Sequence, residues 1–266
     1  MTILTDRQQQ TPDEQARTRP VILNLGCGTK TSEHCINVDY SMYMILRQNA
    51  WAIPLAAPII GSDRVERIKA MRGTMVRQNL KNGMPFASGF ADAVYHSHVM
   101  EHIPRDAVLG FQKEIFRVLK PGGVQRLCLP DLEQLVQAYT SSLAADDMTN
   151  EASCRHDASV AAMIEQCVRD EPGGTRRRTG IRVSCEKLLL GDARARGETH
   201  RWMWDRVNIR AVLGEAGFTD ITVQAWNQSA IDGWAGLDLE RSSDGGEHKQ
   251  MSLYIECRRP AQLVLV

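Results

Sequence analysis

Two glycines one residue apart, followed closely by an aspartate, are the residues best suited to chemistry in this sequence. An apolar run that starts at Val21 leads into Gly26-Cys27-Gly28, and a second short apolar stretch ends at Asp39. Glycine lets a backbone approach a ligand closely because it has no Cβ. An acid at the end of the next strand can accept hydrogen bonds from ribose hydroxyls. The pattern therefore predicts a nucleoside-type cofactor site at the carboxyl edge of a parallel sheet.

The spacing of this motif bears on which cofactor is bound. Nicotinamide and flavin binders use G-x-G-x-x-G/A, with an acid about 20 residues further on and a helix that points at a pyrophosphate. Here Thr31 stands at the third position, and Asp39 follows Gly28 by only eleven residues, which leaves little room for a full helix. S-adenosylmethionine has no phosphate and needs only the close turn and the acid. We expect S-adenosylmethionine; for the turn taken alone, a purely structural role is the alternative.

Downstream segments resemble the class I S-adenosylmethionine-dependent methyltransferases. The resemblance rests on Met84-Pro85-Phe86 before the stretch 90–95, on the stretch 97–102 (SHVMEH), and above all on 116–123 (FRVLKPGG). It covers about residues 20–135 and, more loosely, the end of the chain, where 214–218 (GEAGF) resembles the turn before the family's sixth strand. It implies an α/β fold, a Rossmann-like seven-stranded mostly parallel sheet with helices on both faces.

The same resemblance implies a set of cofactor-binding residues at the sheet edge. These are Gly26, Cys27, Gly28, Asp39, Tyr40, Asn79, Leu80, His96 and Ser97. The glycine turn would run beside the methionine part, Asp39 would accept from both ribose hydroxyls, and Tyr40 would pack on the adenine. Asn79 departs from the family pattern, which often has an acid there, although its carbonyl can still accept from the adenine amine.

Three residues are candidate catalytic groups: His98, His200 and Asp131. His98 directly follows the fourth strand, and a histidine lies near its titration point at neutral pH. Asp131 ends the fifth strand, and its alternative role is to cap the helix that follows. Glu101 and His102 belong to a segment shared widely in the family, which favours a scaffolding role in the cofactor pocket.

The stretch 200–205 (HRWMWD) is unusually rich in aromatic and charged residues for a chain with 6% aromatic content. It is similar to a segment of bacterial methyltransferases encoded near surface-polysaccharide and secondary-metabolite pathways. Aromatic faces pack against sugar rings or planar ligands. We therefore expect Arg201, Trp202 and Trp204 to bind the acceptor, with a tryptophan-rich anchor between insert and core as the alternative.

Two further patterns were weighed as ligand sites. His98-x-x-Glu101-His102 fits the H-x-x-E-H metal pattern, but that pattern needs a helix, and Pro104 follows almost at once. A divalent metal is therefore possible but not favoured, and no metal ligand is predicted. Arg176-Arg177-Arg178 can clamp a phosphate or carboxylate of the acceptor, with a solvated loop as the more probable alternative.

The composition of the chain limits the classes of partner that it is expected to bind. The formal net charge is zero, so the basic footprint of a nucleic-acid binder is absent, and no apolar run has the length of a membrane span. The seven cysteines are scattered, with no C-x-x-C pair. We expect a cytoplasmic protein whose partner is a small-molecule substrate, with neither nucleic acid nor membrane; the oligomeric state stays open.

The order of apolar runs and turn residues predicts four parts. Residues 1–19 form a flexible arm, 20–139 the cofactor-binding core, 140–198 an inserted helical lid, and 199–266 the end of the core sheet. Within the core, helices are expected near 42–50 and 63–71 with a loop between them, and a helix from about Pro104 is expected to end at the glycines after Lys120.

Taken together, these features predict an S-adenosylmethionine-dependent methyltransferase acting on a small molecule. The favoured acceptor is a hydroxyl of a sugar or a secondary-metabolite intermediate. The alternatives are an N-methyltransferase, or a protein of this fold that binds S-adenosylmethionine for cyclase or decarboxylase chemistry. A nucleic-acid methyltransferase is disfavoured by the neutral charge and by the lack of N/D-P-P-Y after the fourth strand.

Overall fold

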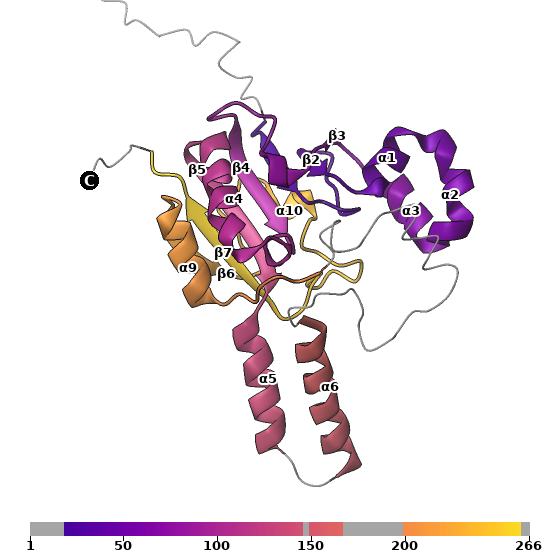
Figure 1. Ribbon diagram of the computed structural model, residues 1–266, viewed down its shortest axis with the longest axis vertical. Coiled ribbons are helices and arrows are strands. Elements are labelled where there is room, and N and C mark those ends of the chain that lie inside the picture. Colours follow the sequence, from indigo (N-terminus) through magenta and orange to yellow (C-terminus); the bar gives the residue numbers. More distant parts are fainter. Residues whose placement is uncertain (1–18, 146–148, 167–198, 262–266) are drawn as a thin grey trace, which may run out of the picture.

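A computed structural model of the chain describes residues 19–145, 149–166 and 199–261. Strands and helices alternate over most of the described part (Figure 1). The α-helices and strands are, in chain order, β1 (Ile22–Leu25), β2 (Cys35–Asp39), α1 (Met42–Gln48), α2 (Ile53–Ile60), α3 (Ser62–Ala70), β3 (Thr74–Arg77), β4 (Ala91–Ser97), α4 (Arg105–Val118), β5 (Leu119–Pro130), α5 (Leu132–Ala144), α6 (Asn150–Gln166), α9 (Arg206–Glu215), β6 (Thr219–Gln224), α10 (Trp234–Leu237) and β7 (Ser252–Arg258).

The strands form one seven-stranded sheet in the order β3-β2-β1-β4-β5-β7-β6. All neighbours are parallel except β7, which is antiparallel to both β5 and β6. The predicted mostly parallel Rossmann-like sheet is therefore confirmed. Because parallel strands end at the same edge, the residues after β1, β2, β4 and β5 meet there.

Helices α4 and α9 cover one face of the sheet. In α4, Val108, Phe111 and Ile115 recur at helical spacing and are buried, and in α9 Ile209 and Leu213 are buried beside them. They pack in one cluster with the inward residues of β1, β4, β5 and β7. This core holds the strand ends rigidly, which is what a site built on them requires.

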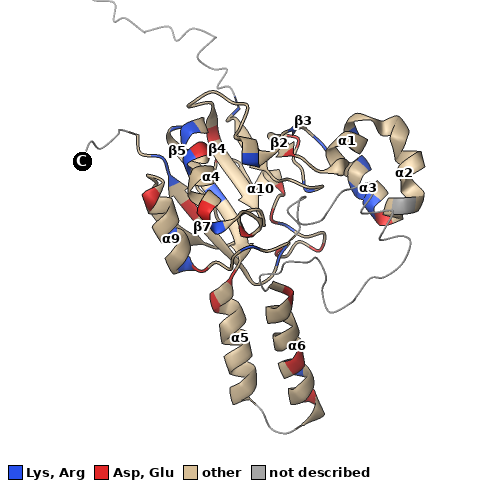
Figure 2. Cartoon of the chain, viewed as in Figure 1, with Lys and Arg blue, Asp and Glu red and all other residues tan. Residues whose placement is uncertain are grey.

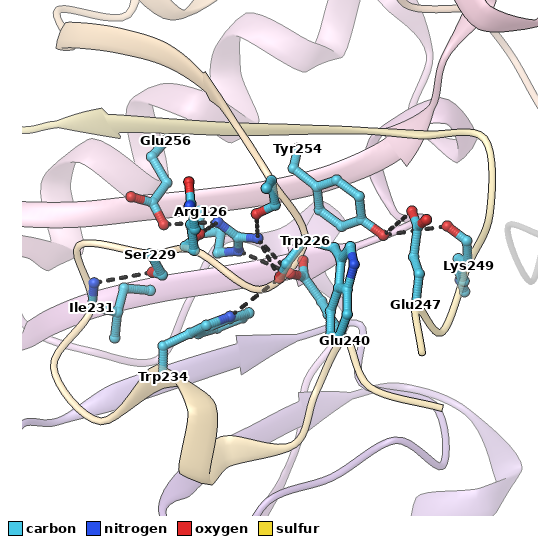
Figure 3. A network of polar contacts seen from close by, with 12 residues as sticks. Arg126, Trp226, Ser229, Ile231, Trp234, Glu240, Glu247, Lys249, Tyr254 and Glu256 are labelled. Carbon is cyan, nitrogen blue, oxygen red and sulfur yellow. Dashed lines mark hydrogen bonds and ion pairs between the residues drawn. The ribbon is translucent and has the colours of Figure 1, made fainter. Parts of the chain in front are cut away.

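The connection between β6 and β7, which includes the short helix α10, covers the other face over β4 and β5. Its anchor is Arg126 of β5, whose side chain is fully buried (Figure 3). The guanidinium donates to Glu240 Oε2 (Nε, 3.0 Å) and Glu256 Oε1 (Nη1, 2.9 Å), and to the carbonyls of residues 225, 226 and 228. Burial raises the pKa of Glu240 to about 7, against the lowering effect of Arg126. One cation facing two buried carboxylates leaves excess negative charge, so we expect Glu240 to retain a proton near neutrality.

The segment between β2 and β3 differs from the expectation of two helices around a loop. Helices α1 and α3 form where they were expected, but residues 53–60 form the additional helix α2. Pro54 lies in the first turn, where backbone N–H groups have no intrahelical partner, so it is compatible with a helix start. Pro58 lies inside the same helix and removes one bond only. Two prolines were therefore too little evidence for a loop.

The glycines after Lys120 do not cap a helix, contrary to the prediction. Helix α4 ends at Val118, and Leu119 is already extended. Gly122 takes φ +80° in a turn that is enclosed within β5, and a Cβ on Gly123 would lie 3.0 Å from the carbonyl of Asp92. The glycines thus let β5 approach β4 closely, and Lys120 completes the contact with an ion pair to Asp92 at 2.7 Å.

Helices α5 and α6 pack side by side as a hairpin that projects from the sheet (Figure 1). Ser142 Oγ joins them through His156 Nδ1 and Ser159 Oγ, both at 2.9 Å. Charged residues of both signs are interspersed over the core, whereas the one acidic or basic residue of α5 is Glu133 in its first turn (Figure 2). The predicted arginine cluster 176–178 lies outside the described residues. Among the described helices, none combines the length and the apolar character that crossing a membrane requires.

Candidate active site

The turn after β1 is held open by two glycines in the left-handed region. Gly26 has φ +61° and donates to the carbonyl of Val38 at 2.7 Å, and Gly28 has φ +53°. An added Cβ at Gly28 would meet no atom within 4 Å, so the backbone borders free space there. Cys27 points the other way, into the cluster formed with α1 and α3. The turn therefore leaves open space beside Gly28, and the cofactor contacts of Gly26 and Gly28 stay a prediction.

Asp39 clamps this turn. Its Oδ2 accepts from the backbone N–H of Gly28 at 2.7 Å and its Oδ1 from that of Ser41 at 2.6 Å. A carboxylate has about four lone-pair sites, so two remain for ribose hydroxyls. The next residue, Tyr40, is 54% exposed and stacks against the Arg77 guanidinium, 4.3 Å from the ring centroid.

A buried pair of asparagines supports the turn, and sequence reasoning missed it. Asn24 Nδ2 donates to Asn37 Oδ1 at 2.9 Å and to the carbonyl of Lys30 at 3.0 Å. Asn37 Nδ2 in turn contacts backbone carbonyls including that of Ser32 at 3.0 Å. The available signal was a polar residue in the middle of each of two apolar strands.

The remaining predicted cofactor residues take different places. Asn79 Oδ1 accepts from the N–H of Lys81 at 3.1 Å and so caps the short turn that follows, while Leu80 packs against the main core. His96 does not face the sheet edge. It is fully buried against Phe111 of α4, its Nε2 lies 3.2 Å from Gln125 Nε2, and burial lowers its pKa to about 3. In this structure His96 belongs to the core, and Ser97 is the half-buried residue that follows it.

The segment after β4 packs directly on the glycine turn. A Cβ on Gly26 would lie inside van der Waals contact of Val99 Cγ2, so the absent side chain makes room for Val99. Val99 lies between the candidate base His98 and Glu101. The cofactor turn and the candidate catalytic segment are therefore neighbours in space as well as on the same sheet edge.

His98 is held in an uncommon conformation. Its φ is +52°, its Nδ1 lies 3.3 Å from Glu101 Oε1, and its Nε2 lies 3.1 Å from Ser252 Oγ. Burial, together with nearby cationic groups, lowers its pKa to about 2. Such a weak base is poorly matched to proton abstraction near neutral pH, so the structure speaks against His98 as the general base.

Glu101 lies at the centre of the segment. It is 1% exposed, and neither carboxylate oxygen has a hydrogen-bond partner among the residues that the structure describes. Burial raises its pKa to about 7. Sequence reasoning assigned it to scaffolding, but a buried carboxyl that titrates near neutrality is a feature of functional sites.

His200 is far from Glu101 in the sequence but lies next to its carboxylate in the structure. The N–H of Arg201 donates to the carbonyl of Glu101 at 2.6 Å, which fixes the stretch 200–205 against the turn at 100–102. The rings of His102 and His200 meet edge to face with centroids 4.9 Å apart. Burial lowers the pKa of His102 to about 4.

A small pocket opens beside this cluster, and it contains the predicted acceptor-binding tryptophans. Its lining consists of Glu101, Pro130, Gln166, His200, Trp202, Met203 and Trp204. Within the described part of the chain, the indole N–H groups of Trp202 and Trp204 have no hydrogen-bond partner. Trp202 stacks under the Arg105 guanidinium at 4.0 Å, and Trp204 is 2% exposed within the main core.

Asp131, the third catalytic candidate, takes its alternative role. Its Oδ1 accepts from the N–H of Glu133 at 3.0 Å and its Oδ2 from the side-chain amide of Gln134 at 2.9 Å. Both oxygens are thus used to start α5. Asp131 also pairs with Trp204 in an isolated bridge, so it positions a pocket residue.

Comparison with known proteins finds similarity to methyltransferases. Residues 23–127 match the methyltransferase domain family. Similar solved structures include S-adenosylmethionine-dependent methyltransferases from Mesorhizobium loti (17% identity, 91% of each chain, TM-score 0.42), Methanosarcina mazei (14%, 95% of this chain and 99% of that one, 0.43) and Archaeoglobus fulgidus (12%, 91% and 87%, 0.43). No curated protein matches the sequence.

The matched residues include the glycine turn, Asp39, the 98–102 segment and the turn at 120–123. Residues 23–127 therefore carry a methyltransferase domain on a seven-stranded, mostly parallel sheet. The protein is an S-adenosylmethionine-dependent methyltransferase, and S-adenosylmethionine is its cofactor. The free space at Gly28 and the remaining lone pairs of Asp39 fit that cofactor.

Proposed function

We propose that this methyltransferase acts on a small molecule, at a hydroxyl of a sugar or a secondary-metabolite intermediate. The observation that carries the proposal is the pocket beside Glu101. Two indole N–H groups and a carboxylate border it without hydrogen-bond partners, next to apolar ring faces. Apolar faces with a few convergent polar groups are typical of small-molecule sites, and a polyhydroxylated acceptor would satisfy the free donors and acceptor.

The position of this pocket supports transfer from a cofactor in the glycine turn. Val99 packs on Gly26, and the adjacent Glu101 lines the pocket, so one short segment touches both regions. S-adenosylmethionine supplies a methyl group on a positively charged sulfur. The protein's part is to align the acceptor oxygen with that methyl group and exclude water, which is worth up to roughly 7–11 kcal/mol.

The cofactor contacts belong to the same proposal. Gly26, Cys27 and Gly28 present backbone to the methionine part, Asp39 accepts from the ribose, and Tyr40 offers an open ring face for the adenine. Asn79, Leu80 and Ser97 complete the cofactor site in this proposal.

The catalytic role predicted for His200 is placed in the cluster that it forms with Glu101 at the edge of the pocket. His98, with its pKa near 2, orients Glu101 and takes no proton itself. Helix α6 lies within the proposed lid 140–198, and its last residue, Gln166, lines the pocket. We place the enzyme in the cytoplasm, in keeping with the free state of all five described cysteines.

The proposal is tested by the release of S-adenosylhomocysteine over a panel of nucleotide-linked sugars, phenols and primary amines. We expect turnover with hydroxyl acceptors. Replacing Trp202 by alanine should raise KM for the acceptor and leave S-adenosylhomocysteine binding unchanged. Trp51→Ala, at a 75% exposed residue outside the pocket, is the matched control. Turnover with amines alone, or consumption of S-adenosylmethionine without a methylated product, would refute the acceptor class.

A further inference from the structure

The cluster beside the pocket combines the donor atoms of a metal site. Glu101, His102 and His200 each offer one ligand atom, and these three atoms all lie within 4.8 Å of one another. We propose that these three residues bind a divalent transition-metal cation of the Zn²⁺ type. Ligands of a tetrahedral site at about 2 Å from the metal lie about 3–4 Å apart, so small side-chain adjustments are sufficient to close the cluster.

The burial of Glu101 is the second, independent observation. Its carboxylate is 1% exposed, and within the described residues both of its oxygens lack a hydrogen-bond partner. Buried polar groups are nearly always satisfied, because an unpaired one costs several kcal/mol. His98 Nδ1 at 3.3 Å and His102 Nε2 at 3.9 Å approach the carboxylate but complete no hydrogen bond with it. A cation among these atoms supplies the missing partner.

His200 is oriented as a metal ligand. Its Nδ1 lies 3.0 Å from the backbone carbonyl of Gln166, and a carbonyl only accepts, so the proton is on Nδ1. The lone pair is therefore on Nε2, the nitrogen left for a metal. Metal-binding histidines typically donate their other N–H to a carbonyl or carboxylate in this way.

The donor set indicates the class of metal. One carboxylate and two imidazoles suit Zn²⁺ and neighbouring divalent metals better than Mg²⁺ or Ca²⁺, which prefer all-oxygen sites. Three protein ligands leave a fourth position, as in catalytic rather than structural zinc sites. Glu101 and His200 both line the pocket, so that position is open to a water or to an oxygen of the acceptor.

The spacing of residues in the sequence alone indicated a different set of metal ligands. It paired His98 with His102 on a helix, which the structure does not form. Residues 100–102 make a short 3-10 turn instead, and the third ligand arrives from residue 200. Lys249 is the competing cation: it lowers the pKa of Glu101 through its charge, but makes no ion pair with it in the described part of the chain.

The test is direct metal binding, without cofactor or acceptor, so that its outcome is independent of the proposed methyl acceptor. Full-length protein treated with EDTA and dialysed is titrated with ZnCl₂ by calorimetry, and with CoCl₂ by visible absorption. We expect one cation per chain, and a loss of affinity of more than about tenfold in His200→Ala and in Glu101→Gln, which keeps the side-chain shape.

The matched control is His34→Ala. His34 Nε2 lies 3.6 Å from Glu33 Oε1 in a solvent-exposed pair, so it offers the same donor types without burial. This variant should bind Zn²⁺ like the native chain. Circular dichroism and the melting temperature without metal establish that each variant is folded, and added Zn²⁺ should raise Tm in the native protein but not in His200→Ala. Absence of binding, binding unchanged in folded Glu101→Gln and His200→Ala, or a thiolate-to-cobalt charge-transfer band would overturn the proposal.

Discussion

Replacing Gly26 by alanine should destabilise the protein through one identifiable contact. Alanine at φ +61° costs about 1–2 kcal/mol of folding free energy because Cβ crowds the following carbonyl. The new Cβ also overlaps Val99 Cγ2, and overpacking of this kind costs about 1–3 kcal/mol. The expected total is about 2–5 kcal/mol, a large share of the 5–15 kcal/mol that is typical of a folded domain.

A second substitution, at Val99, isolates the contribution of the overlap between the added Cβ and Val99 Cγ2. Val99→Ala removes both γ-methyl groups and leaves Cβ of residue 99 at an ordinary 3.5 Å from the added atom. Val99 is half-buried, so by itself this change should cost about 1 kcal/mol, from roughly 0.8 kcal/mol per fully buried methylene. In the double variant the overlap disappears. The two losses should therefore fall short of additivity by about 1–3 kcal/mol.

Urea denaturation followed by tryptophan fluorescence measures each free energy of unfolding. Gly89→Ala is the control for backbone strain alone, since Gly89 has φ +68° and no atom within 4 Å of an added Cβ. Gly28→Ala should match Gly89→Ala in stability yet weaken S-adenosylhomocysteine binding, because its Cβ enters the space assigned to the cofactor. If Gly26→Ala loses no more than Gly89→Ala, or if the double variant is additive, the close approach of Val99 is not what requires glycine.

Three further predictions concern stability. Burial raises the pKa of Glu240 from 4.5 to about 7, so the fold retains a proton that the unfolded chain releases, and stability should fall between pH about 4.5 and 7 and then level off. Glu240→Gln, which keeps the bond to Arg126, should reduce that fall by about 3 kcal/mol in thermal melts across this range, and an unchanged slope would contradict the assignment. Asp205→Ala should cost about 1 kcal/mol in urea denaturation by removing the capping box of α9, whereas Asp205→Ser should retain most of it. Gly73→Ala should destabilise more than Gly89→Ala, because its Cβ would overlap the carbonyl of Ser32 at the base of the cofactor turn; equal losses would show that the turn yields at no cost.

Much of the fold could be predicted because its signals are local. The apolar run before Gly26, the acid at Asp39 and the helical spacing in α4 each follow from the preferences of a few adjacent residues. The structure confirms the mostly parallel sheet that these features predicted. The edge strand β3 gave no comparable signal, since its outer residues are exposed and only its middle is half-buried.

The candidate site was harder to predict because it depends on contacts across the chain. His96 is an example: it was expected at the strand end facing the cofactor, but it lies within β4, and its ring packs against Phe111 of α4. Asp131 shows the converse, since the same strand-end position leads to a helix cap. The approach of His200 to Glu101 spans about a hundred residues, and no local pattern reports it.

Two buried glutamates show how the structure separates a stabilising group from a functional one. Burial raises the pKa of both Glu101 and Glu240 to about 7, so titration alone does not distinguish them. Glu240 binds a guanidinium that also holds three backbone carbonyls, and its network fastens a connection to the sheet. Within the described residues, Glu101 has no hydrogen-bond partner for either oxygen, whereas Glu240 lacks one for Oε1 only, and Glu101 lines a pocket near the edge where the cofactor turn lies. A buried carboxylate without partners costs stability, so of the two glutamates Glu101 is the one that we expect a ligand to complete.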